Sequence, residues 1–207
     1  MMNRVRKVTK QTNNKYLNIY EFESEFRNGF TGTYFVASRR QQPEQLKAVT
    51  HDTRSDGVII YGVYGEKKDR IVLVRQFRYP INDYIYEFPA GLVEPGEDMF
   101  AAGIREIYEE TGLEFTPKNA PNGYSKPFFT TVGMTDECCG TVFGYCNGVP
   151  SNAHQEGSED IEIVLADREE CKRILREENV AIMCAYMLMH FIHSKEEDPL
   201  GFLEELS

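Results

Sequence analysis

The segment from Gly91 to Leu113 carries the residues whose types and spacing are most able to do chemistry. A helix at 100° per residue places three of its carboxylates, Glu106, Glu109 and Glu110, on one face. Glu106 and Glu110 are like charges one turn apart, and the last two glutamates lie near the C-terminal end of the helix, where its dipole disfavours anions. A bound cation would offset both penalties, and clustered carboxylate oxygens favour Mg²⁺ or Mn²⁺ over zinc. The segment therefore predicts a divalent-metal site.

The spacing of this segment separates it from an ordinary solvated acidic helix, which is the alternative interpretation. Five residues lie between Gly91 and Glu97, and seven more precede the run REIYEETGL from Arg105 to Leu113. With U for an apolar residue, the pattern G, five residues, E, seven residues, REUxEExGU resembles the signature of the Nudix hydrolases at all nine fixed positions. The predicted N-cap of the helix and the left-handed residue that ends it are Asp98 and Gly112.

Composition and charge limit the class of protein. The chain has 207 residues, 41% of them hydrophobic and 27% charged, which is ordinary for a soluble domain with an appendage. A net charge of −10 argues against a nucleic-acid partner. The five cysteines are odd in number and show no CxxC spacing, so the sequence supports neither a zinc site nor a disulfide framework. Buried thiols in a reducing cytoplasm are expected.

Two segments bear on secretion and membranes. The basic N-terminus has no apolar core, so we expect no secretory signal. The longest apolar run, from Val180 to Ile192, is too short to span a bilayer. We therefore expect a cytoplasmic protein without a membrane partner.

Apolar periodicity predicts an α+β fold. Tyr16 to Phe22 and Phe30 to Ser38 are rich in aromatic and β-branched residues, and we expect them to form a small N-terminal β element. We place the domain boundary between residues 45 and 46, with an N-terminal β domain at 1–45 and a catalytic domain at 46–207. Further strands are predicted at 57–64, 70–78, 84–89, 124–131, 141–146 and 161–165, and further helices at 167–178 and 180–193.

Three more stretches extend the resemblance from about Tyr16 to Ser194. VLVRQFRYP, YEFPAGLVEPGE and EDIEIVLADREE are similar to the ADP-ribose pyrophosphatase branch of the Nudix hydrolases. The resemblance implies a Nudix α/β/α sandwich with a mixed sheet, preceded by a small N-terminal β domain that two chains exchange in a homodimer. It also implies hydrolysis of the diphosphate of ADP-ribose to AMP and ribose 5-phosphate with Mg²⁺. The alternatives are a pyrophosphatase for a GDP- or UDP-sugar and a sensor that binds a nucleotide sugar without cleaving it; the complete set of signature carboxylates favours an enzyme.

The resemblance assigns the metal ligands residue by residue. Glu106 and Glu110 would hold two or more Mg²⁺ ions, with Glu109 assisting. Glu97 and the backbone carbonyl of Ala90 would complete the coordination. Ions that bridge the phosphates raise the electrophilicity of phosphorus, activate water and neutralise developing charge.

Two arginines have predicted roles in catalysis and substrate binding. Arg105 can pair with Glu109 four residues on, so its expected role is to orient carboxylates. Arg78 closes the RQFR stretch and resembles the family arginine that clamps a phosphate, a task that suits a planar guanidinium better than a lysine. The alternative for Arg78 is a surface salt bridge.

The base of the substrate needs an aromatic slot. The branch stacks adenine between two aromatic residues of the N-terminal domain, often tryptophans, and this chain has no tryptophan. Tyr16 and Tyr34 fall at the corresponding places, and Arg39 matches a substrate-binding arginine. Ordinary packing in a β-sheet is the alternative for the two tyrosines.

The general base is expected outside the signature helix, because the carboxylates of that helix are committed to metal. The branch takes it from an acidic loop before a late strand, which here runs from Ala153 to Asp160. Glu159 aligns best with the functional glutamate and ranks first as base or closing metal ligand, and Glu156 ranks second. The alternative is that these are solvated loop acids. Gly157 and Ser158 would let the loop move over substrate, and His154 is expected to be solvated.

Overall fold

The structure is a computed structural model that describes residues 4–157 and 159–205. Contacts within the chain divide it into two compact units. The N-terminal unit comprises Met1–Asp56 and Pro127–Cys139, and the core unit comprises Gly57–Lys126 and Gly140–Ser207. The predicted domain boundary between residues 45 and 46 stays a prediction.

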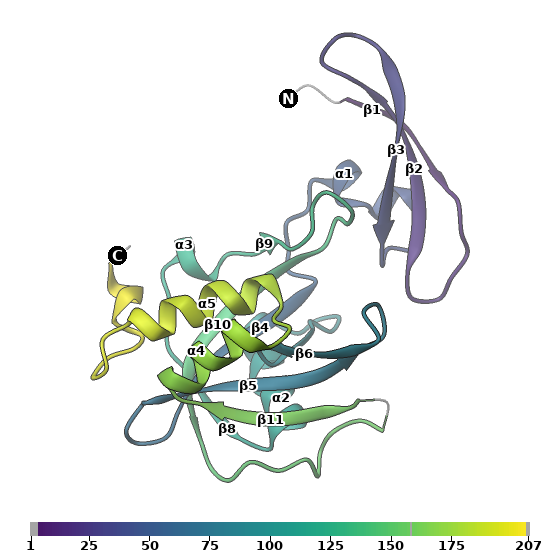
Figure 1. Cartoon of the computed structure of the whole chain (residues 1–207). Coiled ribbons are helices and arrows are strands. Elements are labelled where there is room, and N and C mark those ends of the chain that lie inside the picture. The colour runs from purple at the N-terminus through teal and green to yellow at the C-terminus, as the bar shows by residue number, and fades with distance from the viewer. Residues whose placement is uncertain (1–3, 158, 206–207) are drawn as a thin grey trace. The chain divides into compact units, whose positions relative to one another are not determined.

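The N-terminal unit is built on a three-stranded antiparallel sheet in the order β1-β2-β3 (Figure 1). Tyr20, Phe22 and Val36 alternate along two of its strands toward one face, where they form a buried core with Leu46. The elements are β1 (Val5–Lys10), β2 (Asn18–Glu25), β3 (Thr31–Ser38), the 3₁₀ turn η1 (Pro43–Gln45) and the short helix α1 (Lys47–Thr50).

The larger sheet has eight strands, most of which lie in the core unit. The strands are β4 (Gly57–Tyr64), β5 (Arg70–Arg78), β6 (Asp83–Glu87), β7 (Ala90–Leu92), β8 (Glu114–Pro117), β9 (Phe128–Phe129), β10 (Cys138–Asn147) and β11 (Ile161–Ala166). The main order is β11-β5-β4-β10-β8, with β6 paired to β5, β7 to β4 and β9 to β10. The helices are α2 (Met99–Thr111), α3 (Asn122–Ser125), α4 (Arg168–Glu177), α5 (Ile182–His193) and the 3₁₀ turn η2 (Gly201–Glu204).

Helices cover both faces of the sheet in the core unit. Figure 1 shows α4 and α5 in front of it and α2 behind it. Alternate residues of β4 point to opposite faces of the sheet. Val58 and Ile60 share a buried cluster with Ile107 of α2. Tyr61 faces the other way, where it stacks on Phe88 at 5.3 Å between ring centroids. This three-layer arrangement, with the small N-terminal sheet, confirms the predicted fold class.

One predicted strand is wrong in its first half. Instead of a strand at 124–131, the chain forms α3 and then the two-residue β9. Pro121 is the first residue of a tight turn in which its carbonyl accepts a hydrogen bond from the Tyr124 N–H at 2.9 Å. Pro127 then delays the strand, since a proline has no N–H to donate. None of the helices in the described part of the chain is both long and apolar enough to cross a membrane.

Candidate active site

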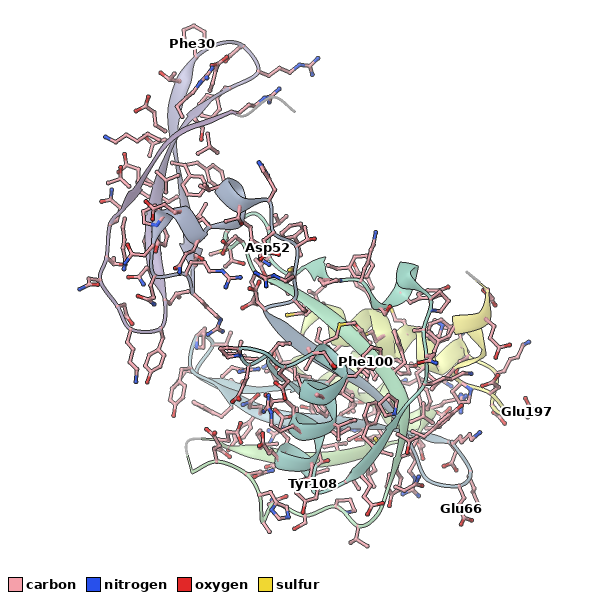
Figure 2. All side chains as sticks on the ribbon, turned by 180° about the vertical axis from the view of Figure 1, so that it is seen from behind. Phe30, Asp52, Glu66, Phe100, Tyr108 and Glu197 are labelled. Atoms are coloured by element: carbon pink, nitrogen blue, oxygen red, sulfur yellow. The ribbon has the colours of Figure 1, made fainter. Side chains whose placement is uncertain are left out.

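Helix α2 begins and ends at the residues that the sequence predicts. The Asp98 carboxylate accepts hydrogen bonds from the N–H groups of Phe100 and Ala101 at 2.8 and 2.9 Å. Gly112 adopts a left-handed conformation with φ 68°, and its N–H donates to the Tyr108 carbonyl. Figure 2 labels Phe100 and Tyr108 near opposite ends of the helix. These caps fix the register of the glutamates between them.

Arg105 is the hub of the acidic cluster. Its Nε and Nη2 donate to the two carboxylate oxygens of Glu97 at 3.1 and 3.0 Å. Its Nη1 donates to Glu106 at 2.8 Å and to Glu109 at 3.0 Å. The predicted ion pair with Glu109 is present, and the same guanidinium also pairs with Glu106. The same guanidinium also donates to the Leu92 carbonyl at 3.0 Å, which ties α2 to β7.

Gly91 makes room for Glu106. A Cβ atom built on Gly91 would lie 1.9 Å from the carboxyl carbon of Glu106, so no other residue fits without displacing that side chain. Burial raises the pKa of Glu106 and the charges of Glu109 and Glu159 raise it further, although Arg105 lowers it. The signature glycine therefore brings this carboxylate against the backbone of β7.

Glu110 is the most unusual residue of the site. Its side chain is only 3% exposed. Its Oε2 atom has no hydrogen-bond partner among the residues that the structure describes, while the Ala90 N–H donates a hydrogen bond to the carboxylate. Burial raises the pKa of Glu110 well above its ordinary value, and the charges of Glu159 and Glu106 raise it further. A buried carboxylate oxygen without a partner in the protein is suited to bind a cation or to take up a proton.

The donor set fits Mg²⁺ or Mn²⁺ chemically, since it consists of carboxylate oxygens and a backbone carbonyl. Within residues 4–157 and 159–205, no three His, Cys, Asp or Glu side chains are grouped so that they could hold a metal ion. Arg105 instead engages three of the predicted ligands, Glu97, Glu106 and Glu109. The unpartnered oxygen of Glu110 is the observation that supports a cation here.

Arg78 lies at the end of β5 and forms a two-point ion pair with Glu87 at the end of β6. Its Nε lies 3.2 Å from one carboxylate oxygen of Glu87 and its Nη2 lies 2.5 Å from the other. Burial lowers the pKa of Arg78, but Glu87 and the charges of Glu110 and Glu159 give a net increase. The predicted phosphate clamp thus lies within electrostatic reach of the acidic cluster. Sequence reasoning missed Glu87, whose pairing depends on the β5–β6 hairpin.

The acidic loop folds into a turn around Glu159. The Glu159 carboxylate accepts a hydrogen bond from the Glu156 N–H at 3.0 Å, and the Glu159 N–H donates to the Glu156 carbonyl at 3.0 Å. The charge of Glu159 raises the pKa of Glu106, of Glu110 and of Arg78. Ser158, which was expected to give the loop freedom, lies outside the described residues.

The predicted base-binding residues lie in the N-terminal unit. Tyr16 is 66% exposed, whereas the Tyr34 hydroxyl donates to the Gly133 carbonyl at 2.6 Å. The Arg39 Nε lies 3.2 Å from a carboxylate oxygen of Glu137. Tyr34 and Arg39 therefore both contact the stretch Pro127–Cys139 of this unit. The sequence analysis did not assign that stretch to the N-terminal domain. A cavity of about 200 Å³ is lined by residues that include Leu17, Arg39, Arg40, Asp56, Asp136 and Glu137.

Comparisons with known proteins agree with this geometry. Residues 53–180 match the family described as NUDIX domain. The chain is 32% identical to "Putative nudix hydrolase 2" of Caenorhabditis elegans over 162 residues, which are 75% of this chain and 68% of that protein. It is 40% identical to the "ADP-ribose pyrophosphatase" of Saccharomyces cerevisiae over 69 residues, which are 33% of this chain and 30% of that protein.

A solved structure of an "ADP compounds hydrolase" has the same fold. Its TM-score is 0.60 with 17% sequence identity, over 84% of this chain and 82% of that chain. Because the chain spans less than a third of the yeast enzyme, that match concerns a segment and not the whole protein. The predicted Nudix fold and the predicted resemblance to the ADP-ribose pyrophosphatase branch are confirmed.

Proposed function

Since the chain belongs to the Nudix family, whose members hydrolyse pyrophosphate bonds, we propose that it is a Mg²⁺-dependent pyrophosphatase that converts ADP-ribose to AMP and ribose 5-phosphate. The observation that carries the metal dependence is the buried, unpartnered oxygen of Glu110 beside Glu106. The choice of ADP-ribose rests on the similarity to the yeast enzyme of that name.

The residues of α2 and its flanking loop would bind Mg²⁺, with Mn²⁺ as a substitute. Glu106 and Glu110 are the main ligands, Glu97 and Glu109 assist, and the Ala90 carbonyl completes the set. When bound, the ion supplies electrophilic activation of phosphorus and neutralises the developing charge. In the structure, ion pairs with Arg105 offset the negative charge of three of the four glutamates.

Other residues bind the substrate and move the proton. Arg78 binds a phosphate oxygen through its planar guanidinium, which Glu87 orients. Glu159 takes the proton from the attacking water, with Glu156 as the second candidate. Tyr16 and Tyr34 stack the adenine, and Arg39 binds the same part of the substrate. Pyrophosphatases for GDP- or UDP-sugars share this phosphate chemistry and differ in the residues that hold the base.

The test is incubation of the protein with Mg²⁺ and separate samples of ADP-ribose, GDP-mannose, a UDP-sugar and NADH, followed by chromatography of the products. We expect AMP and ribose 5-phosphate from ADP-ribose, lost with EDTA and reduced about 10²-fold or more by Glu106→Gln, because the bound ion contributes several kcal/mol to the reaction. Glu66→Gln, an exposed glutamate labelled in Figure 2, is the matched control and should keep full activity. Tight binding of ADP-ribose without cleavage would identify a sensor instead, and preference for another sugar nucleotide would refute the substrate assignment.

We also propose that the chain forms a homodimer. The N-terminal unit leaves Leu17, Ile19 and Phe35 exposed, and a three-stranded sheet of this size buries little apolar surface alone. A second copy that covers these side chains would stabilise the unit. Sedimentation should show a dimer, and a compact active monomer would refute the proposal. The expected cytoplasmic location stays a prediction.

A further inference from the structure

We propose that Tyr108, His154 and Gln155 form a latch that holds the acidic loop on the C-terminal end of α2 and thereby positions Glu159. The inference rests on the proposed function, because it assigns positioning residues for the same reaction. Tyr108 occupies the variable position of the signature, between Ile107 and Glu109, so the signature itself does not require an aromatic side chain there.

The first contact of the latch is a ring stack. Tyr108 points away from the core and is 45% exposed, whereas its neighbour Ile107 is fully buried. The Tyr108 ring lies over the His154 imidazole, with 4.5 Å between ring centroids and 28° between ring planes. This is the geometry of a favourable stacked pair. The ring of the helix residue and the ring of the loop residue, 46 positions apart, therefore contact each other face to face.

The second contact is made by hydrogen bonds to the helix end. A helix leaves its last four carbonyls without partners within the helix. The Gln155 Nε2 donates to the Glu110 carbonyl at 2.8 Å, and the Ser151 N–H donates to the Thr111 carbonyl at 2.8 Å. The loop thus satisfies one carbonyl of α2, and Ser151, which precedes the loop, satisfies another. Because Glu110 supplies both a bonded carbonyl and the buried carboxylate, the loop is fixed directly relative to the acidic cluster.

These contacts bear on Glu159 because this residue lies only four positions after Gln155 in the sequence. Glu156 follows Gln155 directly and forms the reciprocal hydrogen bonds with Glu159 described above. On the far side, the Asp160 carbonyl accepts from the Phe77 N–H at 3.0 Å, and its carboxylate accepts from the Tyr84 hydroxyl at 2.8 Å. Glu159 is therefore held between the end of α2 and the strands β5 and β6. Loss of the latch would leave Glu159 with one anchor.

The experiment combines hydrogen exchange with kinetics on Tyr108→Leu, His154→Ala and the double variant. We expect the amides of residues 153–157 to exchange about three- to tenfold faster, which is the effect of losing one stacked aromatic pair. With ADP-ribose and Mg²⁺, kcat should fall by a similar factor while KM is unchanged. Because both side chains act through one contact, the double variant should lose no more than either single variant.

Two matched controls separate the latch from a general structural effect. Tyr108→Phe keeps the ring and should keep both the slow exchange and the wild-type kcat. Tyr186→Leu removes an exposed tyrosine from α5 and should change neither. Melting temperatures of the Tyr108 and Tyr186 variants should stay close to that of the wild type, since the helix propensities of Leu, Phe and Tyr differ by less than about 0.7 kcal/mol.

Two results would overturn the inference. Unchanged exchange at residues 153–157 in both single variants would show that the stack does not hold the loop. Faster exchange with unchanged kcat would show that the latch does not position Glu159. An inactive wild type would refute the proposed function and the catalytic part of the inference together, and the exchange measurement would still decide whether the latch exists.

Discussion

Replacement of Glu110 with glutamine should stabilise the metal-free protein while it removes activity. The side chain is buried, and its Oε2 atom has no partner among the described residues. The charges of Glu159 and Glu106 repel the ionised form. Glutamine keeps the shape of the side chain and removes its charge, so the variant should be more stable than the wild type in EDTA.

The magnitude follows from the burial of this carboxyl group. The buried carboxylate lowers the free energy of unfolding, but only up to a limit, because the group can take up a proton instead. At pH 7.5 the cost of protonating a carboxyl group with an ordinary pKa of 4.5 is about 4 kcal/mol, which sets that limit. The glutamine amide leaves a buried polar group incompletely bonded, which costs about 1–3 kcal/mol. We therefore expect a net stabilisation of at most about 1–3 kcal/mol, which is a rise in melting temperature of at most about 2–12 °C for a chain of this length.

The assay is thermal unfolding of wild type and Glu110→Gln in EDTA and in Mg²⁺. Because the folded-state pKa of Glu110 is raised, the native state binds more protons than the unfolded state. The stability of the metal-free wild type should fall as pH rises from 4.5 toward that folded value. The variant should lose this part of the slope. Saturating Mg²⁺ at about 100 times its Kd should stabilise the wild type by about 2.7 kcal/mol and the variant by less.

Glu109→Gln is the matched control on the same helix. The Glu109 side chain is 42% exposed and pairs with Arg105, so its neutralisation should destabilise the protein by no more than about 1 kcal/mol. If Glu110→Gln lowers the melting temperature in EDTA, or if both variants behave alike, the reasoning from the buried charge is refuted.

Three further predictions concern the proposed reaction. Glu159→Gln should lower kcat about 10²-fold with KM for ADP-ribose unchanged; an equal loss confined to Glu156→Gln would move the role to that residue. Tyr34→Ala should raise KM more than it lowers kcat, with Tyr34→Phe as the ring-retaining control. Equal use of GDP-mannose and ADP-ribose by the wild type would contradict adenine stacking. Gly91→Ala should lower activity as Glu106→Gln does, because its Cβ would lie 1.9 Å from the Glu106 carboxyl carbon; full activity with a native circular-dichroism spectrum would refute that requirement.

Local signals explain what the sequence could predict. The caps of α2 and the spacing of its glutamates are properties of consecutive residues, so Asp98, Gly112 and the shared face of Glu106 and Glu110 could be predicted without any tertiary contact. The strand β1 could not. Its sequence VRKVTK has only two apolar residues, and its extended conformation depends on pairing with β2.

Contacts across elements explain what the sequence could not predict. Arg78 meets Glu87 only because β5 and β6 form a hairpin, and Tyr108 meets His154 only because the acidic loop returns to α2. Helical spacing revealed one partner of Arg105, the residue four positions on. The contact with Glu97 requires the preceding loop to fold back, which no spacing rule describes.

The structure also changes the reason for expecting a cation. From the sequence, the repulsion between Glu106 and Glu110 requires a ligand for both residues. In the structure, Arg105 already supplies a positive charge to Glu106, whereas Glu110 retains a buried oxygen without a partner in the described chain. The unmet requirement is therefore located at one atom. A cation that binds there must also compete with Arg105 for Glu106, so metal affinity should depend on how easily that ion pair rearranges, in addition to the number of carboxylates.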